Sequence, residues 1–313
     1  MSSQGAGQAM SREDWAILLF LSVLWGGSFF FIELALKTVH PFTLVLIRVA
    51  LAAAMLWVFL WWRKERLPMP PGAASAYLVL ALLNNVIPFV MFAWAQEAIT
   101  GGLASILNAT TPIWGVLLAH LLTNDERMSP RKVAGVLLGF GGVATMIGPT
   151  LLSSLGTNAL AQLACVAASL SYALAAVWAK RFKLLGIPPL SVTIGQMTAG
   201  AIMMLPLSLA IDRPWTQPLP PLGALAAIAA LALLCTAFAY VLYFRLIERA
   251  GATNALLVTL LVPPIAILLG WTFLGEQLAG QDFAGLALIA IGLAAIDGRL
   301  VRRLKARRLR PAA

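Results

Sequence analysis

Three prolines inside apolar segments each follow a polar residue by four positions, in the pairs Asn84–Pro88, Asn108–Pro112 and Thr259–Pro263. Proline has no N–H, so within a helix it deprives the carbonyl four residues earlier of its usual donor. Each pair is therefore predicted to present a backbone carbonyl and a polar side chain together, as a ligand site would. The alternative is a helix-breaking proline whose freed carbonyl is satisfied locally, and both interpretations stay open.

Arg48 stands seven residues after Pro41 in an apolar run, roughly 10 Å along a helix that begins at that proline. Glu33 precedes Lys37 by four residues in the preceding apolar run, and we expect it at a similar depth. Arg48 and Glu33 are predicted to form a structural charge pair, or Arg48 to anchor a substrate carboxylate. Proton exchange by Glu33 ranks lower, because a neighbouring arginine favours the ionised carboxylate.

Further candidates combine an aromatic face or an amide with an apolar setting: Trp25, Trp94, Tyr172, Gln196, Tyr240 and Asn254. Tyrosine and tryptophan offer a large apolar face with one polar group, which suits an amphipathic ligand. Taken singly, each of these side chains is more often a packing residue than a ligand contact.

The chain has 313 residues, of which 61% are hydrophobic and only 11% are charged, with a mean hydropathy of +0.89. Soluble domains contain about 45–50% apolar and about 25% charged residues, so this composition excludes a soluble protein and predicts a lipid bilayer as its surroundings. Cys165 and Cys235 both lie in apolar runs. They form neither a disulfide framework nor a metal-ligand spacing, and we expect no metal and no cofactor.

Apolar runs of the length needed to cross a bilayer, roughly 20 residues, recur along the chain and predict an all-α membrane protein with ten transmembrane helices. The expected spans are Trp15–Leu36, Phe42–Trp62, Ala74–Ala95, Gly102–Leu122, Lys132–Ile147, Ala159–Ala179, Leu190–Ile211, Leu222–Leu246, Ala252–Leu274 and Phe283–Ile296. Turn residues such as the pair His40-Pro41 separate them. The first span is too long for the apolar region of a signal peptide and is expected to be retained.

Lysine and arginine residues orient these spans. With the N-terminus inside, nineteen of the 22 lie on the cytoplasmic side, and only Lys37 and Arg213 lie outside. This bias predicts that both termini are cytoplasmic, in a multi-pass protein of the cytoplasmic (inner) membrane. The net charge of +10 is then mostly a topology signal. The basic tail at 298–313 favours anionic lipid headgroups, and we expect no nucleic-acid partner.

The chain contains an internal duplication. Glu126 and Glu276, Gly135 and Gly285, and Gly142 and Gly292 are each 150 residues apart, and Pro112 and Pro263 are 151 apart. Five spans therefore form one repeat, which gives five-helix repeats at 15–147 and 159–297. Because five is odd, the second copy begins on the opposite side of the membrane. Two inverted repeats with a site between them are typical of secondary transporters.

The chain resembles the EamA family of the drug/metabolite transporter superfamily. The resemblance rests on Trp25-Gly26-Gly27-Ser28-Phe29, on Leu46-Ile47-Arg48 and on the two segments that run from Pro112 to Glu126 and from Pro263 to Glu276. The first of these two segments departs from the family pattern, since it ends in Thr123-Asn124-Asp125-Glu126 rather than Leu-Gly-Glu. The resemblance implies export, or less often import, of small metabolites such as amino acids by alternating access.

Three alternatives stay open: an intramembrane enzyme, a membrane scaffold, and multidrug or cation efflux within the same fold. No catalytic residues are apparent, since His40 and His120 fall at opposite faces of the predicted topology, and no phosphate-binding loop is present. We therefore expect a transporter and not an enzyme, with a small-molecule substrate. Gly135-x-x-x-Gly139 favours close packing within the chain over a dimer interface, and both a monomer and a homodimer stay open.

Overall fold

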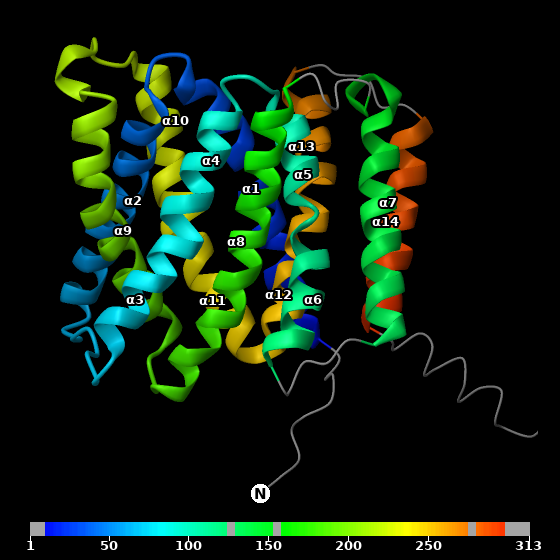
Figure 1. Cartoon of the computed structure of the whole chain (residues 1–313), viewed down its shortest axis with the longest axis horizontal. Helices are drawn as coiled ribbons and strands as arrows, with labels where there is room; N and C mark the ends of the chain where they lie inside the picture. The colour runs from blue at the N-terminus through cyan, green and yellow to red at the C-terminus, as the bar shows by residue number, and fades with distance from the viewer. Residues whose placement is uncertain (1–9, 124–128, 153–157, 275–279, 298–313) are drawn as a thin grey trace, which may run out of the picture.

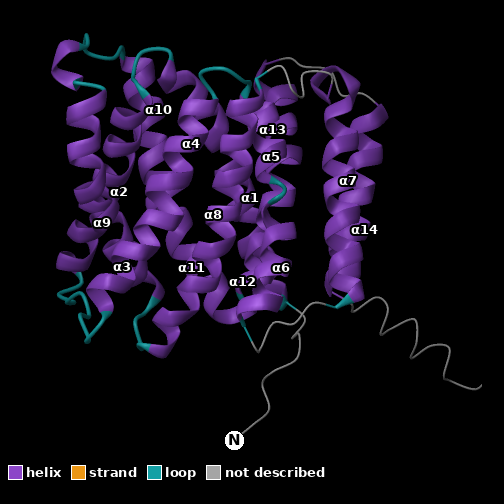
Figure 2. Cartoon of the chain, viewed as in Figure 1, coloured by secondary structure: helices purple, strands orange, loops and turns teal. Residues whose placement is uncertain are grey.

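The computed structural model describes residues 10–123, 129–152, 158–274 and 280–297, and over these residues the chain is helical without strands (Figure 2). The prediction of an all-α protein is confirmed. Within the described residues, seven helical segments are long and apolar enough to cross a membrane: Arg12–Leu36, Pro41–Trp62, Ala73–Ala95, Gly101–Leu122, Ala159–Leu184, Pro189–Ile211 and Leu222–Ala250. Each coincides with a predicted span, with ends that differ by a few residues.

The other three predicted spans are also helical. They correspond to α7 (Pro130–Leu152), to α12 (Ala252–Leu256) with α13 (Val258–Leu274), and to α14 (Gly280–Asp297). Apolar stretches of α12–α13 and of α14 are shorter, at Ala252–Ile265 and Phe283–Ile296. That these three also cross the membrane stays a prediction.

Local sequence explains where the longest helices begin. Ser11 caps α1 (Arg12–Leu36): its hydroxyl accepts from the Asp14 amide, and the Asp14 carboxylate accepts in return from the Ser11 amide. This reciprocal pair satisfies two amides that the first helical turn leaves without partners. Proline opens both α2 (Pro41–Trp62) and α9 (Pro189–Ile211), at the one helical position where its missing N–H costs nothing.

Two long segments contain a π-helical turn near their centres. The first comprises α3 (Ala73–Ala81), η1 (Leu82–Val86) and α4 (Ile87–Ala95). The second comprises α10 (Leu222–Ala232), η3 (Leu233–Phe238) and α11 (Ala239–Ala250). A π-helical turn leaves some carbonyls outside the regular ladder. η1 directly precedes the α4 turn that contains Pro88, whereas η3 occurs without a proline.

Pro112 and Pro263 act differently on their helices. Pro112 lies in the first turn of α6 (Thr111–Leu122), directly after the break that ends α5 (Gly101–Asn108). Pro263 does not break its helix: it lies inside α13, and the nearby interruption falls at Leu257. The prediction that Pro263 is helix-breaking is therefore corrected. A proline removes one hydrogen bond and clashes with the turn that precedes it. In this segment the helix is interrupted at Leu257, ahead of the turn that precedes Pro263.

The helices lie roughly parallel or antiparallel in one bundle (Figure 1). α1 begins and α14 ends at the same end of this bundle, which we call the terminal end; the α1–α2 connection lies at the other, the distal end. α2 packs against α9, α1 against α13, and α6 against α8 (Ala159–Leu184). α7 and α14 form a closely packed pair at one edge of the bundle (Figure 1).

Glycines allow the backbones of α7 and α14 to approach each other. A β-carbon on Gly135 would lie 2.6 Å from the carbonyl oxygen of Gly292, and one on Gly142 would lie 2.7 Å from that of Gly285. Gly135 and Gly285 are repeat counterparts, 150 positions apart, and so are Gly142 and Gly292. In the structure, Gly135 contacts the counterpart of Gly142, and Gly142 contacts the counterpart of Gly135. Such reciprocal contacts are the pattern that a two-fold axis produces.

Candidate functional site

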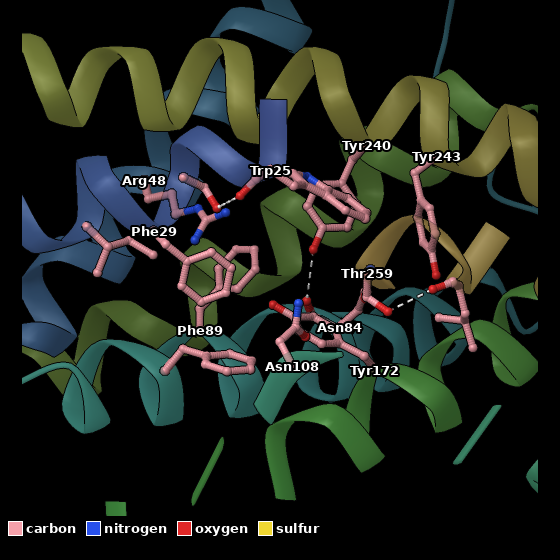
Figure 3. Close-up of a pocket in the computed structure, with 14 residues that line it drawn as sticks. Trp25, Phe29, Arg48, Asn84, Phe89, Asn108, Tyr172, Tyr240, Tyr243 and Thr259 are labelled. Carbon is pink, nitrogen blue, oxygen red and sulfur yellow. Dashed lines mark hydrogen bonds between the residues drawn. The ribbon is translucent and has the colours of Figure 1, made fainter. Parts of the chain in front are cut away.

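A cavity of about 50 Å³ lies within the bundle. That volume holds water molecules or a small chemical group. Its walls combine aromatic rings, two amides, two aliphatic and three phenolic hydroxyls and one guanidinium (Figure 3), contributed by Trp25, Ser28, Phe29, Ile32, Arg48, Asn84, Phe89, Phe92, Asn108, Tyr172, Tyr240, Tyr243, Leu256 and Thr259. Helices from both predicted repeats contribute to the cavity.

Arg48 is the charged residue among those that line the cavity, and only 5% of its surface is exposed. Its Nε donates a hydrogen bond to the hydroxyl of Thr236 in η3 at 2.7 Å. The Thr236 hydroxyl in turn donates to the Leu231 carbonyl at 2.7 Å. The guanidinium carbon lies 3.6 Å from the centroid of the Phe89 ring. One hydrogen bond and one ring therefore fix the plane of the guanidinium.

The predicted Arg48–Glu33 charge pair is not formed. Glu33 is exposed on α1, and a β-carbon on Gly101 would lie 3.2 Å from its carboxylate. Spacing along the sequence sets the depth of each residue along its helix, but it does not set how far each helix is rotated about its axis. The rotation turns Glu33 away from the cavity, and Thr236 takes the place that the carboxylate was expected to fill.

Asn84 connects three helical segments. Its Nδ2 donates to Oε1 of Gln196 on α9 at 3.0 Å, and its backbone carbonyl accepts from the Tyr240 hydroxyl at 3.4 Å (Figure 3). This carbonyl is the one that Pro88 was predicted to free. The equivalent arrangement occurs at η3, where the indole N–H of Trp25 donates to the Cys235 carbonyl at 3.1 Å. Aromatic donors therefore satisfy a carbonyl in each π-helical turn.

Asn108 and Thr259 also line the cavity. The Asn108 carbonyl, which Pro112 was predicted to free, accepts from the hydroxyl of Thr111 at 2.6 Å. Here the local explanation for the freed carbonyl is correct, although the Asn108 side chain still faces the cavity. The Thr259 hydroxyl donates to the Leu256 carbonyl at 2.8 Å (Figure 3).

Aromatic rings form most of the remaining wall. The ring of Trp25 lies 5.5 Å from that of Tyr240 and 5.1 Å from that of Tyr243, centroid to centroid. Tyr172 stacks on Phe92 at 6.0 Å. Distances in this range are favourable for ring pairs. The wall is therefore a packed surface of apolar faces whose hydroxyl and indole groups supply a few polar positions.

Three sequence candidates lie outside the cavity wall. Trp94 is 40% exposed, Gln196 is buried behind Asn84, and Asn254 donates to the Ala250 carbonyl at 2.9 Å. The sequence missed half of the wall, namely Ser28, Phe29, Ile32, Phe89, Phe92, Tyr243 and Leu256. Helical spacing offers a signal for some of these: Phe29 and Ile32 follow Trp25 by four and seven positions, as residues on one helix face do.

Different contacts join the helices at the two ends of the bundle. At the terminal end, Arg249 of α11 pairs with Asp14 at 2.8 Å and with Glu13 at 2.7 Å, and Arg245 pairs with Glu13 at 3.2 Å. At the distal end, the Thr43 amide of α2 donates to the Asp212 carboxylate at 2.6 Å. Apolar contacts dominate between these ends.

The part of the chain that the structure describes contains no group of three or more His, Cys, Asp or Glu side chains able to hold a metal ion. His40 lies at the distal end and His120 in the last turn of α6, at the terminal end. The cavity instead offers hydrogen bonds, ring faces and one cation. These features suit binding of a small molecule.

Apolar helices long enough to cross a membrane pack around a small cavity whose wall contains a few polar groups, and this arrangement defines a multi-pass membrane protein. The model of the EamA-like transporter family matches residues 14–148 and 159–296, and the chain belongs to that family.

Relatives cover nearly the whole chain at low identity. An "uncharacterized transporter YoaV" of Bacillus subtilis is 23% identical, over 88% of this chain and 94% of its own. Protein PecM of Dickeya dadantii is 28% identical, over 90% of both chains. The "uncharacterized inner membrane transporter YedA" of Escherichia coli is 24% identical, over 88% of both. One crystal structure superposes with a TM-score of 0.74 at 20% identity over 94% of this chain, which shows the fold alone.

Proposed function

We propose that the chain is a secondary transporter that exports a small metabolite, an amino acid or a similar amphipathic solute, by alternating access. The observation that carries this proposal is the cavity, whose aromatic wall contains a guanidinium, amides and hydroxyls and is lined by both halves of a bundle of apolar helices. Hydrogen-bonding groups and a cation inside a membrane are costly and mark substrate pathways. The transporter names of relatives such as YoaV and YedA agree with it.

Two inverted five-helix repeats, at 15–147 and 159–297, would build this transporter from ten spans. Support comes from the two segments that the family model matches and from the reciprocal glycine contacts of α7 and α14. Pairing of α2 with α9, each the second helix of its half, agrees with the same two-fold relation. Binding between the halves lets a rocking motion expose the site to one side at a time.

The lysine and arginine bias places the terminal end in the cytoplasm, with the tail at 298–313 beyond the described residues. The ion pairs of Glu13 and Asp14 with Arg245 and Arg249 would then close the cytoplasmic side. Glu33 is the candidate for proton coupling, as an exposed carboxylate toward the distal end of α1. The residues that line the cavity all come from one chain, which supports transport by a monomer, while a homodimer also stays open.

An enzyme or a scaffold is supported less well. Enzymatic chemistry would require a nucleophile, base or metal ligand poised at the cavity, and the wall described above offers amides, phenols and a guanidinium. A scaffold would not require polar side chains inside the bundle.

Flux in reconstituted vesicles tests the proposal. Purified protein in lipid vesicles, loaded with isotope-labelled amino acids, is expected to release a subset of them faster than protein-free vesicles do. Recovery of the released solute without covalent change distinguishes transport from catalysis. A panel of amino acids and other small amphipathic solutes released no faster than from protein-free vesicles would contradict the proposal.

A further inference from the structure

We propose, building on the transport function above, that the cavity selects substrates that carry a carboxylate on a flat apolar body, and that Arg48 binds this carboxylate. The inference names a substrate class for the site and excludes cationic solutes. It rests on the charge of the cavity, on the geometry of the guanidinium and on the counterpart of Arg48 in the other repeat.

The charge of Arg48 has no counter-charge in the cavity. Arg48 is buried, no acidic residue is among those that line the cavity, and no described carboxylate pairs with it. Removing a cation from water without a partner is expensive. A bound anion would offset that cost, and a bound cation would add to it. The electrostatics therefore favour anionic over cationic substrates.

The geometry of the guanidinium leaves its outer edge available. Nε is engaged by Thr236 and one face of the guanidinium by Phe89. Among the described residues, neither terminal nitrogen of Arg48 has a hydrogen-bond partner. Guanidinium N–H groups form a planar fork that matches the two oxygens of a carboxylate. Because Thr236 and Phe89 already hold the plane, a carboxylate would bind a preorganised donor pair.

Packing alone does not require this charge. Arg48 lies seven residues after Pro41, and Gln196 lies seven residues after Pro189, the first residue of α9. Each side chain bonds to the π-helical turn of the other half, Arg48 to Thr236 in η3 and Gln196 to Asn84 in η1. In the second repeat, the neutral amide of Gln196 makes the equivalent contact. The contact between the repeats therefore does not require the positive charge of Arg48.

The other side chains of the cavity wall indicate which groups the rest of the substrate carries. The rings of Trp25, Tyr172 and Tyr240 offer flat apolar surfaces with single polar groups. Asn84 and Asn108 add amides able to bind a second polar substituent. The volume of about 50 Å³ takes a small chemical group such as the carboxylate, so binding of the whole substrate requires the helices to separate.

Three probes with one body test the inference: 3-phenylpropanoate, its neutral amide 3-phenylpropanamide, and the cation 3-phenylpropylamine. Binding to the purified full-length protein is measured by calorimetry. The wild type is expected to bind the carboxylate more tightly than the amide and the amine least tightly. Arg48→Gln, which copies the residue of the other repeat, should weaken carboxylate binding roughly 10- to 150-fold and leave amide binding within about twofold.

Two further variants serve as controls. Arg181→Gln removes an exposed arginine that also lies over a ring, 5.2 Å from that of Trp178, and is expected to leave all three affinities unchanged. Arg48→Lys keeps the charge without the fork and should retain part of the preference. If Arg48→Gln does not fold, the order of affinities in the wild type and in Arg48→Lys still decides the matter.

Equal or weaker binding of the carboxylate relative to the amide by the wild type would overturn the inference, as would an unchanged preference in folded Arg48→Gln. Vesicle flux separates this result from the transport proposal. Flux of neutral or cationic solutes with no carboxylate preference would leave transport intact and remove the substrate class. Carboxylate binding without flux of any solute would support the ligand class and contradict the transport proposal.

Discussion

Gly142 of α7 and Gly285 of α14 meet backbone to backbone, since a β-carbon on Gly142 would lie 2.7 Å from the carbonyl oxygen of Gly285. That approach is closer than any side chain tolerates, and backbone atoms cannot move aside as a flexible side chain can. The contact ties the last helix of one half to the last helix of the other.

We expect Gly142→Ala to separate α7 from α14 and to destabilise the protein by about 1–3 kcal/mol, as overpacking typically does. Gly141 is the matched control, because a β-carbon at that position meets nothing within 4 Å. Thermal unfolding of both variants in detergent measures the difference. Equal melting temperatures would mean that the helices do not approach this closely in the membrane protein.

Thr236→Val should lower the stability of the protein, because it removes the hydrogen-bond acceptor of the Arg48 Nε. Valine keeps the shape of threonine but removes the hydroxyl that accepts from Nε at 2.7 Å. Leaving such a buried donor without its acceptor costs about 1–3 kcal/mol. Thr236→Ser, which keeps the hydroxyl, is expected to unfold close to the wild-type temperature. The idea fails if the serine and valine variants lose the same stability.

Asn84→Leu and Asn108→Leu test the amides of the cavity wall. Leucine is well tolerated among apolar helices, so both proteins should insert and fold, and each should lose at least about tenfold in substrate affinity if a ligand hydrogen bond is removed. Asn84→Leu should also lower the melting temperature more, because Asn84 bonds Gln196 whereas Asn108 is engaged locally. Vesicle flux and melting curves give both readouts, and wild-type flux in both variants would remove the amides from the pathway.

Arg249→Gln should weaken closure at the terminal end. Its ion pairs with Glu13 and Asp14 are partly exposed, and solvent screens the attraction in such pairs, so we expect a small increase in the open population. A cysteine in place of Ser28, which lines the cavity, reports this opening when a thiol reagent is added on the terminal side. Arg63→Gln removes contacts within its own neighbourhood, the pair with Glu65 and the position over the Phe59 ring, and should leave the labelling rate unchanged.

Orientation is open to direct measurement. In a background without Cys165 and Cys235, a cysteine at Gly280 should react with an impermeant thiol reagent added outside intact cells. A cysteine at Arg66 should react only after the membrane is permeabilised. Both positions are exposed. Gly280 is the first residue of α14, which begins at the distal end, whereas Arg66 lies in the connection between α2 and α3, at the terminal end (Figure 1). The reverse labelling pattern would invert the topology.

Composition and periodicity predicted the helices well, because a run of apolar residues as long as a bilayer is thick has few alternatives to a helix. Proline chemistry also located Asn84, Asn108 and Thr259, all of which line the cavity. This worked because the N–H that proline lacks would have bonded the carbonyl four residues earlier in the same helix, so the affected position follows from the sequence alone.

Contacts between helices were less accessible to the sequence. Arg48 was assigned Glu33 as a partner, but its actual partner is Thr236, 188 residues away. Helix rotation decides such pairings, and it follows from the packing of the whole bundle rather than from local spacing. Gln196 was likewise expected at the pathway and lies behind Asn84.

The π-helical turns η1 and η3 have a mechanical consequence. A π turn contains about one residue more than an α turn, so its displacement along a helix by one position twists the residues in between by about 100°. Asn84 in η1 and Thr236 in η3 occupy these positions. If either turn shifted by one position, the polar group that it carries would face another direction while both ends of its helix stayed in place.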